Sequence, residues 1–217
     1  MYLPAHFQET RGEVLAALMR THPFATLVTT TADAACGFSA NHLPLEYDPL
    51  PAPFGTLRGH VARANPLWRE AAGAAGANQA LAIFQGPHAY ISPAWYPSKL
   101  EAGKAVPTWN YAVVHAHGRL KFFEDRQQLR DLVAMLTDRH EAGRPHPWRV
   151  SDAPEDYLEQ MLKAIVGFEM PVTRLVGKWK VSQNRATADR AGVIAGLNSE
   201  RGIHATDMAN LIKETLQ

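Results

Sequence analysis

The chain has 217 residues, of which 46% are hydrophobic, and its formal net charge is +1. These values allow a sizeable core and exclude the strongly basic composition of a dedicated DNA-binding domain. The single cysteine, Cys36, excludes an intrachain disulfide framework and a cysteine-based zinc cluster. No apolar run approaches about 18 residues and no secretory signal pattern is visible, so we expect a cytoplasmic protein without a membrane span.

The N-terminal part of the chain predicts strands with short helices between them. Apolar residues at helical spacing predict a first helix, and His22-Pro23 ends it because the residue before proline disfavours the helical conformation. Gly86-Pro87 interrupts a later apolar run and predicts a hairpin turn there. The predicted elements up to this turn are helices over 9–20 and 67–72, strands over 24–30, 37–47, 54–62 and 79–85, and a hairpin partner over 89–92.

The C-terminal part begins with a proline-rich segment, 93–107, which predicts a long loop. The elements predicted after it are one long strand or two over 108–123, a strand over 166–176, and helices over 125–140, 154–165, 188–197 and 205–216. Many strands follow one another directly, which favours an antiparallel barrel with added helices over a doubly wound parallel sheet. We therefore predict a barrel domain over 1–185 and a helical C-terminal extension over 186–217.

Two segments carry cations that would suit a phosphate. Arg63 lies where a strand ends and a helix begins, beside backbone N–H groups that have no helical partner. A surface arginine that merely flanks a helix start is the alternative. The segment 177–185 places Trp179 among polar and charged residues, which suits an anion or a nucleotide. With Arg174 and Arg190 it could equally form a small nucleic-acid patch, or it is simply a solvated strand end.

Two other segments are rich in aromatic residues. Tyr90, Trp95 and Tyr96 could line a slot for a planar ring, or form a lid over the core or an oligomer interface. In a strand over 108–118, Trp109 and Tyr111 share one face, and the Asn110 amide suits a uracil-like ring edge. His115 and His117 have the spacing of metal ligands, but no carboxylate follows at a suggestive distance, so we favour a structural role.

Taken together, these segments resemble the PaiB family of FMN-binding negative transcriptional regulators. The resemblance rests on six stretches in chain order, from residue 1 to about 190. They are Met1-Tyr2-x-Pro4-x-His6-Phe7, Asn41-His42-Leu43-Pro44, Gly59-His60-x-Ala62-Arg63-Ala64-Asn65-Pro66, Phe84-Gln85-Gly86-Pro87-His88-Ala89-Tyr90 with Ser92-Pro93-x-Trp95-Tyr96, Val106-Pro107-Thr108-Trp109-Asn110-Tyr111, and Lys180-x-Ser182-Gln183-Asn184-Arg185.

This resemblance implies an α+β fold, the antiparallel split β-barrel of FMN-binding proteins, in which a homodimer shares each FMN site at its interface. It implies Arg63 as phosphate ligand with His60 and Ala64 beside it. The other implied FMN contacts are Asn41, His42 and Leu43 along the isoalloxazine, Trp109, Asn110 and Tyr111 as the next wall, and Gln183, Asn184 and Arg185 closing the site. No catalytic residue and no metal ligand is implied.

Three functions remain open on this basis. The first is a flavin-binding repressor whose contact with DNA is weak or indirect, as the low net charge suggests. The second is an FMN-dependent oxidoreductase that uses NAD(P)H or oxygen on a small molecule, since one fold hosts many functions. The third is an interaction protein whose barrel has lost its ligand.

Overall fold

The computed structural model describes residues 1–31, 37–73, 78–99, 103–200 and 202–216. Cys36 and residues 100–102 of the predicted loop lie outside these ranges. Within them, no helix is both long enough and apolar enough to cross a membrane.

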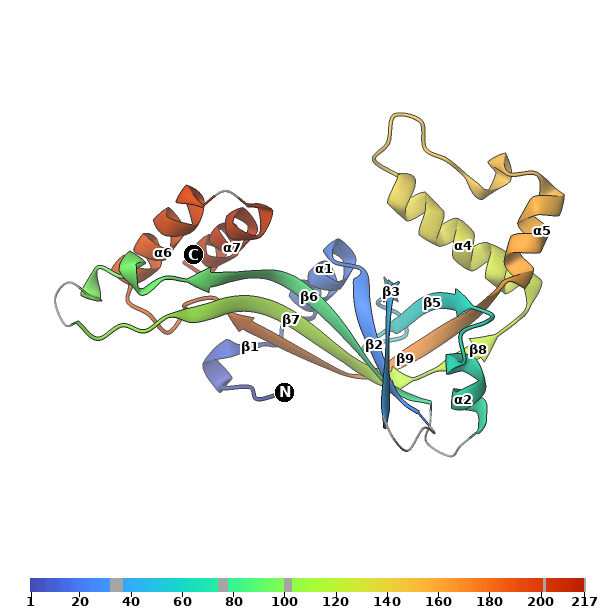
Figure 1. Cartoon of the computed structure of the whole chain (residues 1–217), viewed down its shortest axis with the longest axis horizontal. Coiled ribbons are helices and arrows are strands. Elements are labelled where there is room, and N and C mark those ends of the chain that lie inside the picture. Colours follow the sequence, from blue (N-terminus) through green and yellow to red (C-terminus); the bar gives the residue numbers. More distant parts are fainter. Residues whose placement is uncertain (32–36, 74–77, 100–102, 201, 217) are drawn as a thin grey trace. The chain divides into compact units, whose positions relative to one another are not determined.

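The described strands form one antiparallel sheet with the hydrogen-bonded order β3-β2-β6-β7-β9-β5-β4 (Figure 1). Two further short strands, β1 and β8, both pair with β9. The bounds are β1 Gln8–Glu9, β2 Phe24–Thr30, β3 Phe38–Pro44, β4 Glu46–Asp48, β5 Thr56–Ala62, β6 Gln79–Ile91, β7 Thr108–Arg119, β8 Lys121–Phe123 and β9 Ile165–Lys180.

The helices lie between and after these strands. They are α1 Gly12–Thr21, α2 Leu67–Gly73, α4 Arg126–Glu141, α5 Glu155–Lys163, α6 Thr187–Ser199 and α7 Ile203–Glu214, with 3₁₀ turns at Ala5–Phe7, Pro93–Trp95 and Val150–Asp152. Asp125 begins α4, because its carboxylate accepts a hydrogen bond from the Gln128 backbone N–H (2.9 Å).

The two end strands of this order are consecutive in the chain, which closes the sheet into a barrel. β3 pairs with β2 and β4 pairs with β5, and only Leu45 separates β3 from β4. Leu45 is 1% exposed. Gly59 of β5 lets the wall close here, because a Cβ at this position would stand 2.9 Å from both Leu45 Cδ2 and Phe168 Cζ.

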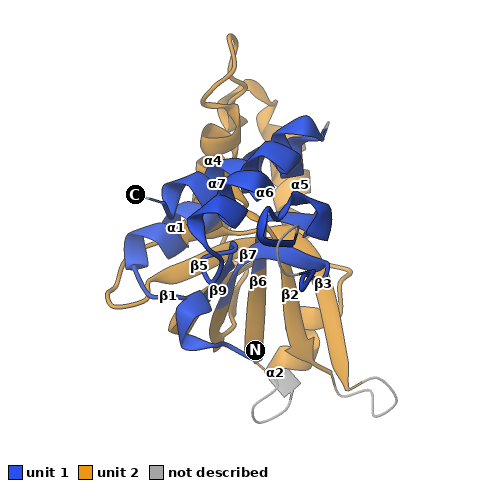
Figure 2. Ribbon diagram, turned by 90° about the vertical axis from the view of Figure 1, so that its left-hand side faces the viewer, with its two compact units in different colours: residues 1–18, 84–115, 176–217 blue, residues 19–83, 116–175 orange. Residues whose placement is uncertain are grey.

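The chain forms two compact units (Figure 2). Each of the long strands β6, β7 and β9 has one part of its residues in unit 1 and the other part in unit 2. Unit 1 consists of residues 1–18, 84–115 and 176–217, and unit 2 of residues 19–83 and 116–175. In unit 1, α6 and α7 pack side by side, and Met208 and Ile212 of α7 are fully buried. In unit 2, the barrel interior is apolar, and a separate cluster under α4 and α5 contains Leu129, Val150, Leu158 and Leu162.

Most predicted elements are present, with shifts of a few residues at their ends, but the hairpin at Gly86-Pro87 was wrong. β6 runs through this dipeptide without a turn. Gly86 is there for close packing, because a Cβ would stand 2.8 Å from Leu18 Cδ1 and 3.3 Å from the Ala112 carbonyl oxygen. A glycine inside a strand pattern therefore marks a close approach here rather than a turn.

Candidate functional site

The twelve residues predicted to bind FMN fall into two sets, one in each unit. Unit 2 holds the predicted contacts of β3 and of the β5–α2 junction, namely Asn41, His42, Leu43, His60, Arg63 and Ala64. Unit 1 holds those of β7 and of the turn after β9, namely Trp109, Asn110, Tyr111, Gln183, Asn184 and Arg185.

In unit 2, a pair of asparagines joins β3 to the start of α2. Asn65 Nδ2 donates to Asn41 Oδ1 (2.7 Å), and Asn65 Oδ1 accepts from the Leu67 backbone N–H at the start of α2 (3.0 Å). Next along β3, His42 is exposed and its Nδ1 shares a hydrogen bond with Thr26 Oγ1 of β2 (3.1 Å). The structure thus brings the predicted β3 residues and the β5–α2 junction together, while Leu43 faces the core.

His60 of β5 lies half-buried next to this junction. Its Nδ1 is buried and has no hydrogen-bond partner among the described residues. Burial lowers the pKa of His60 below its ordinary value of 6.5, because the charged imidazolium loses hydration. Its environment therefore favours the uncharged form of the ring, and Nδ1 offers a buried polar atom without a partner among the described residues.

Arg63 is already engaged within unit 2. Its Nε donates to the Lys163 carbonyl (2.7 Å), its Nη2 donates to the Ile165 carbonyl (3.2 Å), and its Nη1 forms an ion pair with Glu124. Each terminal nitrogen has two N–H groups, so, counting the described residues, one donor on each remains for a ligand. The side chain is 35% exposed. The Glu124 carboxylate, however, already balances the charge of the guanidinium.

A shallow hollow lies on the barrel wall of unit 2, beside the predicted β3 contacts. Its volume is about 200 Å³. It is lined by Val28, Thr29, Thr30, Phe38, Gln79, Ala80, Leu81 and His117. Phe38 is 69% exposed, whereas Thr29 is 2% exposed and its hydroxyl has no partner among the described residues. An open apolar wall with an unused buried hydroxyl suits a flat ring with a polar edge.

In unit 1, the predicted contacts surround a tightly bonded turn. Asn110 is 1% exposed and donates from Nδ2 to Ser182 Oγ (2.8 Å). Ser182 has a φ of 64°, which a side chain seldom adopts, and this bond helps to hold it there. The Gln183 amide accepts from the Val181 N–H (2.8 Å) and donates to the Trp179 carbonyl. Asn110 and Gln183 therefore shape the turn with their amide groups.

The aromatic residues of unit 1 do not form one slot. Trp109 is 54% exposed and Tyr90 is 45% exposed, and their rings meet edge to face with centroids 6.2 Å apart. Tyr96 is only 2% exposed, and Trp95 packs against Gly196 of α6. Trp95 and Tyr96 therefore pack as a lid over the core, which was one of the predicted alternatives. Trp109 and Tyr90 remain available to a ligand.

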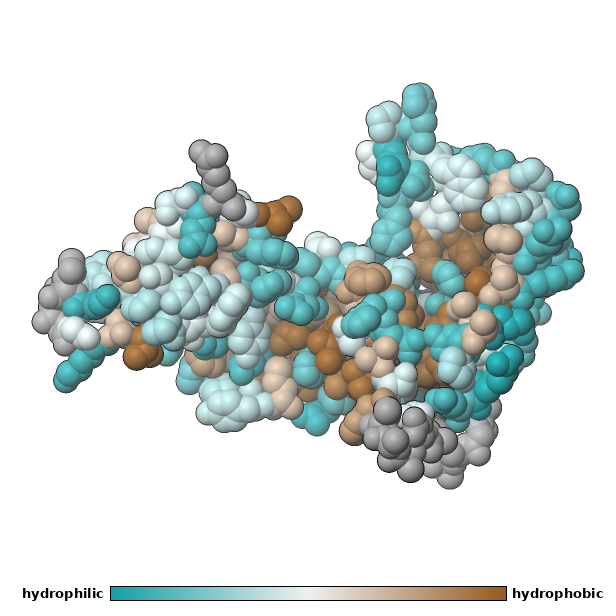
Figure 3. Space-filling view, viewed as in Figure 1, coloured by the Kyte–Doolittle hydropathy of each residue, from teal (hydrophilic) through white to brown (hydrophobic). Residues whose placement is uncertain are grey.

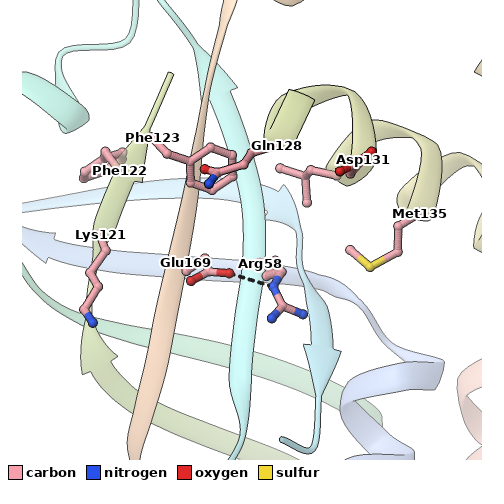
Figure 4. Close-up of a pocket in the computed structure, with 9 residues that line it drawn as sticks. Arg58, Lys121, Phe122, Phe123, Gln128, Asp131, Met135 and Glu169 are labelled. Carbon is pink, nitrogen blue, oxygen red and sulfur yellow. Dashed lines mark hydrogen bonds and ion pairs between the residues drawn. The ribbon is translucent and has the colours of Figure 1, made fainter. Parts of the chain in front are cut away.

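A second hollow of unit 2 contains none of the predicted contacts. It measures about 450 Å³ and lies between α4 and the strands β5, β8 and β9 (Figure 4). Hydrophobic surface is visible in the hollow beneath α4 (Figure 3). At its floor, Arg58 donates to Glu169 (2.9 Å) and to Asp48 (2.8 Å), so this cation is fully paired.

Two lysines of β9 contact the predicted residues of unit 1, although they were not themselves among the predicted contacts. Lys178 is 6% exposed and lies over the Tyr111 ring, 5.3 Å from its centroid. Lys180 donates to the Trp109 carbonyl (2.7 Å). Their i, i+2 spacing in a strand was a usable signal, because it places both side chains on one face.

Known proteins resemble this chain over most of its length. Residues 1–174 match the family described as "Putative FMN-binding domain". Over 217 residues the chain is 35% identical to "Protease synthase and sporulation protein PAI 2" of Bacillus subtilis, an alignment that covers 100% of this chain and 99% of that protein.

Two solved structures show the same fold at low sequence identity. The conserved hypothetical protein Rv2991 of Mycobacterium tuberculosis matches with a TM-score of 0.58 and 11% identity, over 86% of this chain and 94% of that one. The flavocytochrome Anf3 of Azotobacter vinelandii matches with a TM-score of 0.54 and 11% identity, over 80% and 69%. With the strand order, the fold prediction of an antiparallel split barrel with helical additions is confirmed.

Proposed function

The chain belongs to the "Putative FMN-binding domain" family, and from this premise we propose that it binds FMN at a site built by two copies of the chain. The observation that carries this proposal is the division of the predicted contacts between the units. Each set includes exposed residues, and none of the hollows described for either unit is both ligand-sized and lined by these contacts. Ligand pockets typically measure about 300–1,000 Å³, so the hollow of about 200 Å³ on the barrel wall needs a second surface to complete it.

The two half-sites offer complementary chemistry. In unit 2, the open wall of β2, β3 and β6 offers apolar contact to a flat ring, and His60 and Thr29 contribute buried polar atoms without partners among the described residues. In unit 1, Trp109 offers an exposed aromatic surface next to cationic residues. In the proposed dimer, unit 2 of one copy and unit 1 of the other would face the same FMN. When bound, FMN supplies redox chemistry, and these residues bind it and orient its ring.

Binding is tested by the absorbance spectrum of freshly purified protein and by thermal unfolding with added FMN. A ligand that binds only the folded state stabilises it by about 2.7 kcal/mol at one hundred times Kd. We expect visible flavin absorbance, or a clear rise in Tm with FMN. Colourless protein whose Tm does not respond to FMN would contradict the proposal.

We further propose that FMN binding serves regulation of transcription. The proposal is supported by the family resemblance and by the full-length relative, whose name includes the words "sporulation protein". Because the net charge is only +1, DNA contact is weak or made through a partner. A gel shift with DNA upstream of its own coding region, with and without FMN, tests this role. Turnover of NAD(P)H by the FMN-loaded protein without any DNA effect would favour the oxidoreductase instead.

A further inference from the structure

The hollow beneath α4 in unit 2 is separate from the residues assigned to the FMN site (Figure 4). Its volume of about 450 Å³ lies within the range of about 300–1,000 Å³ that is typical of small-molecule pockets. All the residues that line it belong to unit 2, so a single chain is enough to form it. The chemistry of its lining indicates which class of ligand it would take.

The helix α4 is held against the strands near both of its ends. Near its start, Leu129 packs on Gly167 of β9, where an added Cβ would stand 3.0 Å from Leu129 Cδ2. Near its end, Arg139 forms an ion pair with Glu46 of β4 and donates to the Arg20 carbonyl (2.8 Å). The part of α4 that covers the hollow lies between these contacts. The space beneath it is therefore a fixed feature of the folded unit.

The sides of the hollow are largely apolar. From α4, Leu132 and Met135 face it at helical spacing, and Met135 extends toward the strands (Figure 4). From β8, the half-buried rings of Phe122 and Phe123 line the other side. A methionine side chain adapts its shape to what it contacts, and aromatic rings offer broad apolar contact. These walls suit a ligand that carries apolar groups.

The floor of the hollow carries charges of both signs in neighbouring strands. In the sheet register, Glu169 of β9 stands opposite Lys121 of β8 on one side and opposite Arg58 of β5 on the other. Cross-strand neighbours of opposite charge attract one another. Glu169 pairs with Arg58 (2.9 Å), which also pairs with Asp48 (2.8 Å). Lys121 is thus left without a carboxylate partner among the described residues.

An unpaired carboxylate lies on the opposite side of the hollow from Lys121 (Figure 4). It belongs to Asp131 of α4, which accepts a hydrogen bond from the neutral Gln127 amide (2.8 Å) and has no cation as partner within the described ranges. A ligand with a single charge would leave either Lys121 or Asp131 unmatched. A ligand with a positive and a negative end matches both, provided that its two charges lie far apart.

Between these two charges, the floor offers hydrogen bonds to neutral polar groups. Arg58 Nη2 and Glu169 Oε2 have no hydrogen-bond partner in the described part of the chain. The exposed Gln128 amide can both donate and accept. A peptide backbone presents N–H donors and C=O acceptors in alternation, and it needs both kinds of partner.

We propose that this hollow binds a free di- or tripeptide with apolar side chains. The carboxylate end of the peptide meets Lys121, and its ammonium end meets Asp131. Its backbone amides bond to the polar floor, and its side chains lie against the apolar walls. This inference goes beyond FMN binding and does not depend on it, because the lining of the hollow and the contacts assigned to FMN share no residue.

The test is isothermal titration with the tripeptide leucyl-alanyl-leucine and with its N-acetylated and C-amidated forms, each of which lacks one terminal charge. We expect the free tripeptide to bind the wild type, and each blocked form to bind about three- to tenfold more weakly. Free leucine, whose two charged groups share one carbon atom, should not bind. The tripeptide should bind equally to FMN-free protein and to protein supplied with FMN, so a failure of FMN binding leaves this test intact.

Two variants identify which end of the peptide each charge meets. In Lys121→Gln, amidation should no longer weaken binding while acetylation still does, and in Asp131→Asn the reverse should hold. The matched controls are Lys213→Gln on α7 and Asp156→Asn on α5, which alter exposed residues away from the hollow and should behave as the wild type. The proposal is overturned if the free tripeptide does not bind, or if blocking either end has the same effect in the wild type and in both variants.

Discussion

His60 gives the barrel of unit 2 a pH dependence with a defined sign. Burial lowers the pKa of His60 below 6.5. At pH values between this lowered pKa and 6.5, His60 is therefore protonated in the unfolded chain but not in the folded chain. Stability is therefore lost as pH falls through this range and is fully present above it. We expect His60→Gln to flatten the fall in unfolding free energy between about pH 7.5 and pH 5, as measured by urea denaturation. An equally steep curve for His60→Gln would contradict this assignment.

Asn65 is expected to be the residue that ties β3 to α2. Asn65→Ala removes both its bond to Asn41 and its cap of the Leu67 N–H. We expect a loss of about 1–2 kcal/mol in unfolding free energy, measured by urea denaturation. Asn65→Asp keeps the capping oxygen but replaces the donor to Asn41 Oδ1 by an acceptor, so it disrupts the bond to Asn41 while the cap remains. Equal stability of Asn65→Ala and of an exposed control, Gln160→Ala, would contradict this role.

At the scale of single residues, the sequence could identify cations but not their charge balance. Arg63 and Arg185 look alike in their motifs, yet Glu124 pairs with Arg63 and the described residues place no carboxylate on Arg185. The partner Glu124 is 61 positions away in the chain. Which acid meets which base is decided by strand pairing, and a single sequence does not contain that information directly.

The element α6 depends on a glycine that helix propensity alone would reject. A Cβ on Gly196 would overlap the Trp95 indole, so this glycine makes room for the aromatic ring that packs α6 against the Pro93–Trp95 turn. In an open helix, alanine in place of glycine is favourable by about 1 kcal/mol. Here we expect Gly196→Ala to destabilise the protein by about 1–2 kcal/mol net, because overpacking outweighs propensity.

Thermal unfolding of matched glycine variants tests this expectation for α6. At Gly12, the first residue of α1, an added Cβ would meet nothing within 4 Å, so Gly12→Ala should be neutral or stabilising. A Tm for Gly196→Ala that equals or exceeds the wild-type value would show that Trp95 can move away. The packing of α6 would then not depend on this glycine.

At the scale of elements, regular hydrophobic patterns predicted the helices and strands correctly, whereas a glycine led to a wrong prediction of a turn. The β-branched run of β2 and the apolar stripe of α4 depend on local chemistry, and both elements lie where these patterns place them. Gly86 has the same appearance in sequence as a turn glycine. Only the packing of Leu18 against it shows that β6 continues, and that contact joins residues far apart in the chain.

For the whole molecule, the fold class followed from the succession of strands, but the two units did not. Residues 176–217 group with residues 1–18 and 84–115 because β6, β7 and β9 each continue from one unit into the other. The boundary expected between residues 185 and 186, which would separate a barrel domain from a helical C-terminal extension, stays a prediction. The predicted FMN contacts were likewise expected to surround one ligand, while the structure assigns them to both units.

The proposed dimer makes a prediction about the open barrel wall. Phe38 is 69% exposed on β3 and borders the hollow lined by Val28 and Leu81. Stable interfaces bury about 1,600 Å² in total and concentrate their energy in buried aromatic anchors. If a second copy covers this wall, Phe38→Asp places an unpaired charge in the interface. We expect this variant to sediment as a monomer and to lose FMN affinity at least about tenfold, because each site would lack the second unit.

The matched control for this substitution is Tyr157→Asp, which alters an aromatic residue on α5 that is also exposed, at 54%. It should leave both the sedimentation coefficient and FMN binding unchanged. A folded Phe38→Asp monomer that binds FMN as tightly as the wild type would show that one chain suffices for the site. A wild type that sediments as a monomer at micromolar concentration while retaining FMN would lead to the same conclusion, since the wall would then bind the ring without a second copy.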